Sequence, residues 1–148
     1  MKFTNTVTIN RPPAEVFAFL AHFENVPLWN YAISDTQKIT GGPVGVGSRY
    51  RQTRTLPTQS EETFEVTEVE PDRKLSIQGA LGPFHGEVTY LLQPAGNGTA
   101  LTNTMNLQPS GALRLIAPLA ASRVKSAVAA NLDTLKQILE TIDRPDDR

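Results

Sequence analysis

A set of polar and charged side chains shares one otherwise apolar face of the predicted strands: Tyr50, Gln52, Arg54, Glu62, Tyr90 and Asn103. Hydroxyl and amide groups that converge in a mostly apolar space are typical of a small-molecule site, where they orient the ligand. The alternative is that these groups satisfy one another, the backbone or water, as most buried polar groups do. Both interpretations stay open on the sequence alone.

Two glycines on adjacent predicted strands favour the binding interpretation. Gly79 and Gly86 fall on the same inward face, where a glycine removes side-chain volume. They would face small residues of the C-terminal helix, such as Ala120 and Ala127. The pattern therefore predicts a cavity instead of a solid core.

Other kinds of chemistry find little support in the sequence. The chain has no cysteine, and His22 and His85 lack the spacing of metal ligands. The glycine-rich segment 41–47 is followed by a predicted strand, with Tyr50 where a dinucleotide-binding motif has its third glycine. We expect a flexible loop there, no metal and no cofactor.

Alternation and helical periodicity predict the elements that carry these residues. Polar and apolar residues alternate from Phe3 to Ile9, and short helices should begin at Pro12-Pro13 and lie at Pro27-Leu28. Further strands are expected near residues 32–40, 47–56, 61–70, 73–79, 84–93 and 98–108. Apolar residues in steps of three and four then predict one long amphipathic helix over 110–142, which Pro118 should kink or break.

Turn chemistry predicts the register of two hairpins. A two-residue turn at Asn97-Gly98 would pair Leu92 with Asn103 and Tyr90 with Met105. A loop around Pro57 predicts a second set of pairs: Tyr50 with Val66, Gln52 with Phe64, and Arg51 with Glu65 on the outer face.

Composition limits the range of functions. The chain has 148 residues, of which 39% are hydrophobic, enough for one domain over 1–142 followed by a disordered tail, 143–148. Fourteen Lys and Arg against fifteen Asp and Glu give a formal charge of −1, which provides no field to recruit nucleic acid. The N-terminus has no apolar signal core and no apolar run is long enough to span a membrane, so we expect a cytoplasmic protein.

The order of several motifs resembles the SRPBCC superfamily (START-like or pollen-allergen-like), and within it the polyketide cyclase/dehydrase and lipid-transport family. The matching segments are INRPPAEVFAFL at 9–20, NVPLW at 25–29, GPVGVGSRY at 42–50, PDRKL at 71–75, GTALT at 98–102 and NLDTLKQILE at 131–140. The resemblance implies an α+β helix-grip fold, in which a curved antiparallel sheet of about seven strands wraps around the C-terminal helix. Two short helices would follow the first strand.

The resemblance and the inward polar residues together predict a protein that binds a small hydrophobic ligand, lipid-like or polycyclic, between sheet and helix. The alternatives are a cyclase/dehydratase-type enzyme acting in the same cavity and a regulatory module that binds a protein. The oligomeric state, monomer or homodimer, stays open. The expected ligand-binding residues are Trp29, Tyr50, Gln52, Arg54, Phe64, Ile77, Phe84, Val88, Tyr90, Asn103, Met105, Leu113, Ile116, Ala120 and Val124. Segments 41–47 and 109–118 should form the mouth.

Overall fold

A computed structural model describes residues 1–109 and 117–142 of the chain, with the side chains of 1–108 and 121–142. Along the chain the elements are β1 (Lys2–Ile9), α1 (Pro13–Ala21), the 3-10 helix η1 (Phe23–Asn25), α2 (Val26–Trp29), β2 (Ile33–Lys38), β3 (Arg49–Arg54), β4 (Ser60–Glu70), β5 (Lys74–Leu81), β6 (Phe84–Ala95), β7 (Gly98–Pro109) and α3 (Ala117–Thr141). The predicted strands and short helices are confirmed. Pro118 is the second residue of α3, and the parts of the prediction that fall on 110–116 and 143–148 lie outside the described residues.

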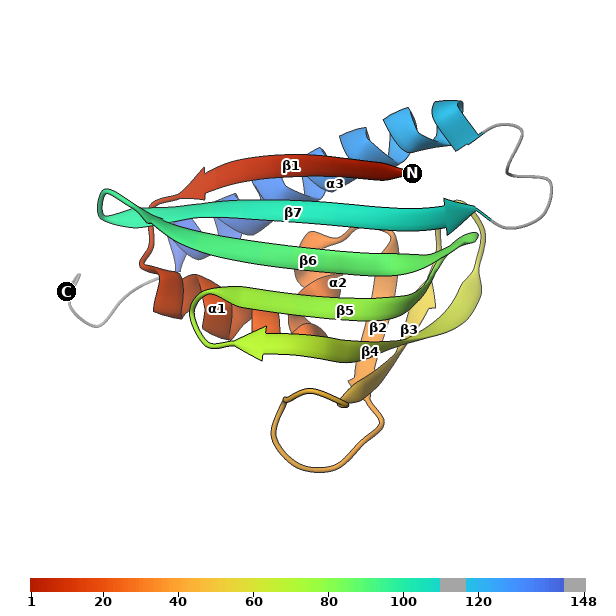
Figure 1. Ribbon diagram of the computed structural model, residues 1–148, viewed down its shortest axis with the longest axis horizontal. Coiled ribbons are helices and arrows are strands. Elements are labelled where there is room, and N and C mark those ends of the chain that lie inside the picture. The colour runs from red at the N-terminus through yellow and green to blue at the C-terminus, as the bar shows by residue number, and fades with distance from the viewer. Residues whose placement is uncertain (110–116, 143–148) are drawn as a thin grey trace.

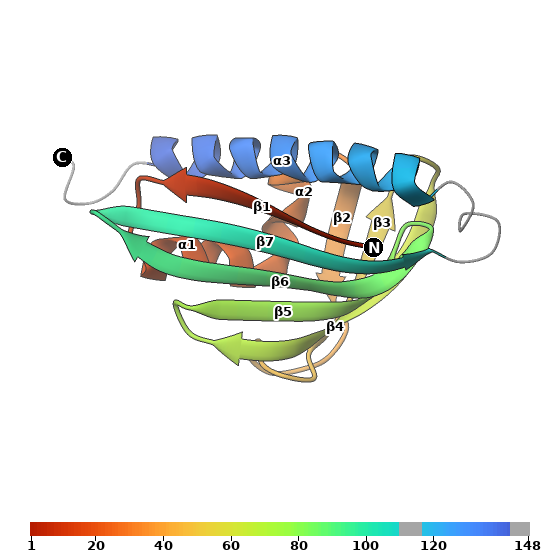
Figure 2. The same ribbon diagram turned by 45° about the horizontal axis from the view of Figure 1, so that its top comes forward.

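The seven strands of the described residues form one antiparallel sheet in the order β1-β7-β6-β5-β4-β3-β2. Figure 1 shows that β2 and β3 lie behind the other strands at a steep angle, so the sheet curls around its inner face. Helices α1 and α2 lie on that inner side, and Figure 2 shows α3 running along β1. The inner face is thus enclosed by the sheet itself and by the helices.

Both hairpin registers differ from the sequence prediction by two residues. Tyr90 pairs with Asn103, and Leu92 pairs with Leu101, because the turn is Gly96-Asn97 instead of Asn97-Gly98. Gly96 has a φ of 59°, which a glycine adopts without strain. A shift of two residues keeps every side chain on its predicted face, because side chains alternate with a period of two.

The β3–β4 register is shifted in the same way. Tyr50 pairs with Phe64, and Gln52 with Glu62. Arg51 lies on the exposed face as expected, but the residue opposite it is Thr63, so the predicted pair with Glu65 was wrong.

The two inward glycines have a different role from the predicted one. Gly79 and Gly86 pair with each other across β5 and β6. A Cβ at Gly79 would lie 2.3 Å from the Thr63 carbonyl oxygen, and one at Gly86 would lie 2.2 Å from the Asn106 carbonyl oxygen. These glycines let the backbones of neighbouring strands approach closely, so the interpretation of them as volume left open for a cavity was wrong.

The apolar stripe of α3 supplies one side of the core. Its residues Val128, Leu132, Leu135 and Leu139 are buried, as the helical spacing predicted. On the other side, aromatic residues from three elements meet: the Tyr50 and Phe64 rings stack with centroids 5.1 Å apart, and Phe23 of η1 lies 4.8 Å from Tyr50.

Polar contacts fix the end of α3 to the start of the chain. The Glu140 carboxylate accepts a 2.7 Å hydrogen bond from the Asn10 backbone N–H and a 2.8 Å bond from the Lys136 ammonium group. Arg11 donates a 2.8 Å bond to the Glu140 carbonyl oxygen. The Lys136 and Asn10 bonds hold the pKa of the Glu140 carboxyl below its usual range. The helix is therefore anchored at this end by charge-assisted hydrogen bonds as well as by packing.

Replacing Gly86 with alanine should destabilise the protein by about 3 kcal/mol, because the added methyl group collides with the backbone of β7. Urea unfolding measures the effect. Gly45→Ala is the matched control, since a Cβ at Gly45 would meet no atom within 4 Å and its φ is not positive. Equal stability of the two variants would contradict the close-approach account.

Replacing Glu140 with glutamine should lower the free energy of unfolding by about 1 kcal/mol at pH 7, since a partly exposed charge-assisted bond is lost. Because the pKa of the Glu140 carboxyl is lower in the folded protein than in the unfolded chain, the ionised carboxylate stabilises the fold at a pH above the pKa in the unfolded chain, near the usual 4.5. This stabilisation is lost as the pH falls through the pKa of the carboxyl in the folded protein. The difference between wild type and variant should therefore shrink below about pH 4.5. Asp133→Asn, on an exposed position of the same helix, should show no such trend.

Candidate functional site

A row of polar side chains crosses the inner face of three neighbouring strands. Tyr90 of β6 pairs with Asn103 of β7, which in turn pairs with Asn5 of β1. The rows on either side are apolar: Leu92, Leu101 and Val7 on one, and Val88, Met105 and Phe3 on the other. The polar row is thus a narrow interruption in a hydrophobic wall.

Asn103 is the residue of this row that lacks partners. It is 1% exposed, and neither its amide nitrogen nor its amide oxygen has a hydrogen bond. The neighbouring Asn5 differs, because its Nδ2 donates a 3.2 Å bond to the Lys125 carbonyl oxygen of α3. A buried polar group left without a partner costs about 1–3 kcal/mol and points to a bound water or ligand.

Tyr90 lies beside this amide, and Trp29 packs against Tyr90. Their rings meet edge to face with centroids 6.4 Å apart. Burial raises the pKa of the Tyr90 phenol above its usual value. The Asn103 amide lies near enough to the phenol to oppose that shift, although the two groups do not meet hydrogen-bond geometry. The phenol therefore stays protonated at neutral pH and can act as a hydrogen-bond donor or acceptor.

Tyr50 carries a second unpartnered hydroxyl. Its ring lies in the aromatic cluster with Phe23 and Phe64, and its buried oxygen has no hydrogen bond. Burial, and then the negative charge of Glu24 on η1, raise the pKa of Tyr50 to about 12. This phenol also remains neutral under physiological conditions.

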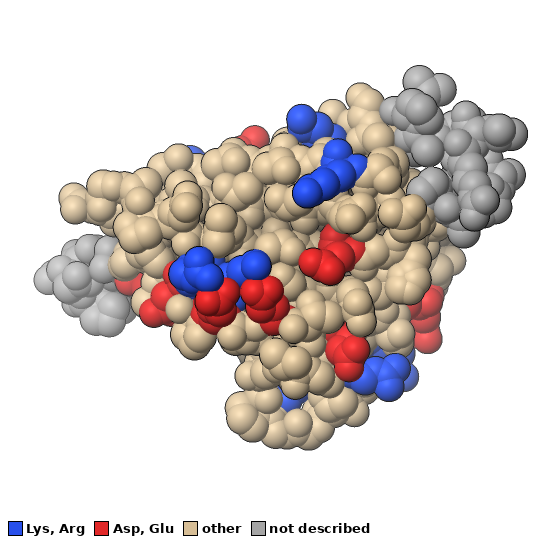
Figure 3. Space-filling view, viewed as in Figure 1, with Lys and Arg blue, Asp and Glu red and all other residues tan. Residues whose placement is uncertain are grey.

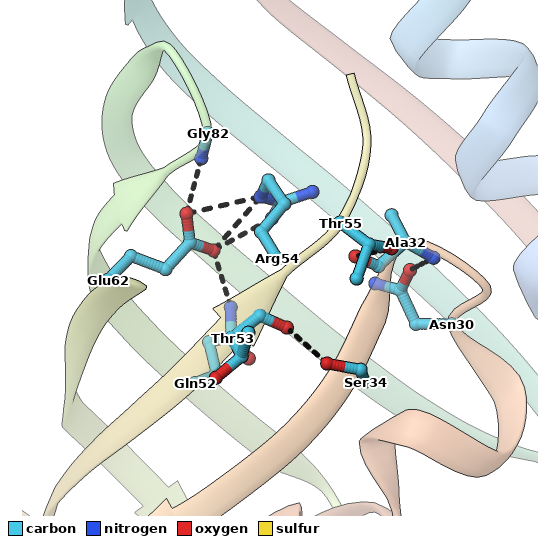
Figure 4. Close-up of polar contacts among 9 residues, drawn as sticks. All are labelled: Asn30, Ala32, Ser34, Gln52, Thr53, Arg54, Thr55, Glu62 and Gly82. Carbon is cyan, nitrogen blue, oxygen red and sulfur yellow. Dashed lines mark hydrogen bonds and ion pairs between the residues drawn. The ribbon is translucent and has the colours of Figure 1, made fainter. Parts of the chain in front are cut away.

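A charged cluster closes the opposite end of the inner face (Figure 4). The Glu62 carboxylate accepts a 2.6 Å bond from Gln52 Nε2, a 2.8 Å bond from Arg54 Nη2 and a 2.7 Å bond from the Gly82 backbone N–H. Arg54 Nε also donates to both Glu62 oxygens, at 3.2 and 3.1 Å. The Glu62 side chain is 3% exposed and that of Arg54 is 14% exposed. Glu62 is therefore a fully bonded counter-ion, unsuited to taking a proton from a substrate.

One more unpartnered group lies next to this cluster. Thr36 of β2 is opposite Gln52, is 4% exposed, and its hydroxyl has no hydrogen bond. Sequence reasoning missed Thr36, Asn5 and Phe23. The period-two alternation of β1 could have identified Asn5, which falls between the inward residues Phe3 and Val7.

The structure brings most of the predicted site residues to the interior. Those buried are Trp29, Tyr50, Gln52, Phe64, Ile77, Phe84, Val88, Tyr90 and Asn103, and those partly buried are Arg54, Met105 and Val124. Leu113 and Ile116 lie outside the described residues, as does the side chain of Ala120. Their common role in ligand binding stays a prediction.

The outer face of the sheet has a different character. Charged side chains of both signs lie close together on it (Figure 3), including the ion pairs Arg73–Glu70 and Lys74–Glu68. Two open surface hollows lie on this face, one around Arg49 and the other around Lys2, and neither includes a residue of the inner polar row. Because Asn103 is buried, a ligand that reaches it has to pass between the sheet and its covering helices.

Two further properties concern the described part of the chain. None of its helices is long and apolar enough to cross a membrane. Within residues 1–109 and 117–142, no three His, Asp or Glu side chains form a group that could hold a metal ion.

A curved sheet that holds a long C-terminal helix over a mostly apolar inner face defines the helix-grip class of α+β proteins. The family model described as polyketide cyclase/dehydrase and lipid transport matches residues 1–140. The chain belongs to this family, which is part of the SRPBCC superfamily.

Solved structures share the fold at low sequence identity. The Zhui aromatase/cyclase from Streptomyces sp. R1128 has a TM-score of 0.82 and 14% identity, covering 99% of this chain and 97% of that one. TTHA0849 from Thermus thermophilus has a TM-score of 0.79 and 17% identity, covering 94% and 97%. MLL2253 from Mesorhizobium loti has a TM-score of 0.76 and 21% identity, covering 97% and 100%. No protein of curated function matches the chain significantly in sequence.

Replacing Asn103 with leucine should raise the free energy of unfolding of the ligand-free protein by about 1 kcal/mol, because a buried amide without partners is replaced by an apolar group of similar size. Thermal or urea unfolding would detect this. Asn5→Leu is the matched comparison in the same row and should destabilise, since it removes the bond to the Lys125 carbonyl. Destabilisation by Asn103→Leu as well would mean that the amide is satisfied.

Proposed function

We propose that the protein binds a small hydrophobic molecule, lipid-like or polycyclic, between the inner face of the sheet and α3. Asn103 and Tyr90 form hydrogen bonds with a polar group of this ligand, while the apolar rows beside them contact its hydrocarbon surface. The observation that carries the proposal is the Asn103 amide, which is buried without a partner in a hydrophobic wall. Membership of a family described by cyclisation and lipid transport supports it.

Binding explains the interior better than catalysis does. Cyclisation or dehydration requires a group that moves a proton near neutral pH. The Glu62 carboxylate is occupied by Arg54, Gln52 and Gly82. The raised pKa values of Tyr50 and Tyr90 disfavour either phenol as a base. The interior therefore offers hydrogen-bonding groups for recognition, and we place a cyclase/dehydratase activity second.

A fluorescence titration tests the proposal. Trp29 is the single tryptophan of the chain and contacts Tyr90, so energy transfer from it to the neutral probe N-phenylnaphthylamine reports binding next to the polar row. We expect saturable binding. A long-chain alcohol such as decanol should then displace the probe.

Asn103→Leu should weaken the binding of decanol roughly tenfold, the value of one hydrogen bond, and change the affinity for the apolar probe much less. Asn106→Leu is the control, since Asn106 lies on the same strand with its side chain exposed on the other face. Absence of saturable probe binding would refute the proposed function, and equal decanol affinities would refute the role of Asn103.

A further inference from the structure

The inner face has a charge balance that bears on the kind of ligand it accepts. Its cation on β3, Arg54, is paired with Glu62 at 2.8 Å, and both side chains are largely buried. Lys38 lies opposite Tyr50 on the edge strand β2, but its ammonium group donates to the carbonyl oxygens of Gly41 and Gly42 in the β2–β3 loop. Among the side chains that the structure describes on this face, no cation is left to pair with a ligand.

A ligand carboxylate would therefore lose its hydration without gaining a counter-ion. Transfer of an unpaired charge into a protein interior is strongly unfavourable. Arg54 does not provide that counter-ion, because its charge is already balanced by Glu62. An anionic lipid is therefore disfavoured, although it would satisfy the apolar rows.

Among the described residues, one buried atom without a partner belongs to a charged group: Arg11 Nε, whose guanidinium donates through its other nitrogens to the carbonyl oxygens of Asn10 and Glu140. The remaining unpartnered groups are neutral. Asn103 offers a donor and an acceptor, and the hydroxyls of Tyr50 and Thr36 each offer both. Such groups match hydroxyl and carbonyl oxygens of a ligand. They lie on strands β7, β3 and β2, on opposite walls of the curved sheet.

We propose that the interior selects uncharged, largely apolar ligands that carry hydroxyl or carbonyl groups, and that Glu62 enforces this selectivity by neutralising Arg54. This inference rests on the proposed function and names the ligand class of the same site. Glu62 is a specificity-determining residue that acts through Arg54 without touching the ligand.

Displacement of N-phenylnaphthylamine by decanol and by decanoate at pH 7.5 tests the selectivity, because the two competitors differ mainly in head-group charge. The wild-type protein should bind decanol at least roughly tenfold more tightly than decanoate, relative to the partition of each into detergent micelles. Glu62→Gln keeps an oxygen acceptor for Arg54 but removes the compensating charge. It should bring the two affinities within roughly threefold of each other, mainly by tightening decanoate binding.

Glu61→Gln is the matched control, with the same change of net charge at the adjacent, exposed position of β4. It should keep the wild-type preference. The double variant Arg54→Gln/Glu62→Gln removes both charges and should also keep it, which provides a second test if Glu62→Gln does not fold.

The outcomes separate the two proposals. Probe binding with equal affinities for decanol and decanoate in the wild type would overturn the selectivity and leave the proposed function intact. An unchanged preference in folded Glu62→Gln, or a gain of decanoate binding by the double variant, would overturn the role of the Arg54–Glu62 pair. Absence of probe binding would overturn both proposals.

Discussion

The enclosed interior of this protein depends on the close approach of backbones in the central strands of its sheet. Gly79 and Gly86 face each other across β5 and β6, and a side chain at either position would collide with the adjacent strand. Phe64 pairs with Gly79 in the same row and stacks on Tyr50. This row of residues therefore connects the closely packed central strands to β3. Because β3 and β2 lie behind the other strands (Figure 1), the sheet encloses an inner face that the helices cover.

The interior has two parts, which differ in whether their buried polar groups have hydrogen-bond partners. Toward the C-terminal end of α3, Leu132, Leu135 and Leu139 pack in an apolar core. Next to it, Glu140 binds the backbone N–H of Asn10, the residue that follows β1. Closer to Lys125, the wall carries the polar row with its unpaired Asn103. Proteins usually satisfy every buried polar group, and departures from this rule concentrate at functional sites. The stability of one part allows the other to keep buried polar groups that have no partner within the protein.

Much of the fold could be predicted because strand alternation and helical spacing are local properties. The registers could not be fixed, since Ala95-Gly96-Asn97-Gly98 contains two overlapping dipeptides that both suit a tight turn. Each side chain nevertheless lies on its predicted face of the sheet, because both registers differ from the prediction by two residues. The role of Gly79 and Gly86 was not predictable, because a missing side chain looks the same in sequence whether its place is empty or filled by a neighbouring backbone.

The site shows the same limit for polar side chains. Gln52 and Asn103 are both inward amides among apolar neighbours, and the sequence treats them alike. They differ in the hydrogen-bond partners that the neighbouring strands provide. Gln52 donates a hydrogen bond to the Glu62 carboxylate on the neighbouring strand. Asn103 lies between Tyr90 and Asn5, and the Asn5 amide already bonds to α3. Whether an inward polar residue is structural or free for a ligand is decided by its partners across the sheet. Two register shifts were enough to hide those partners. The candidate residues could therefore be named from the sequence, but which of them lack partners could not.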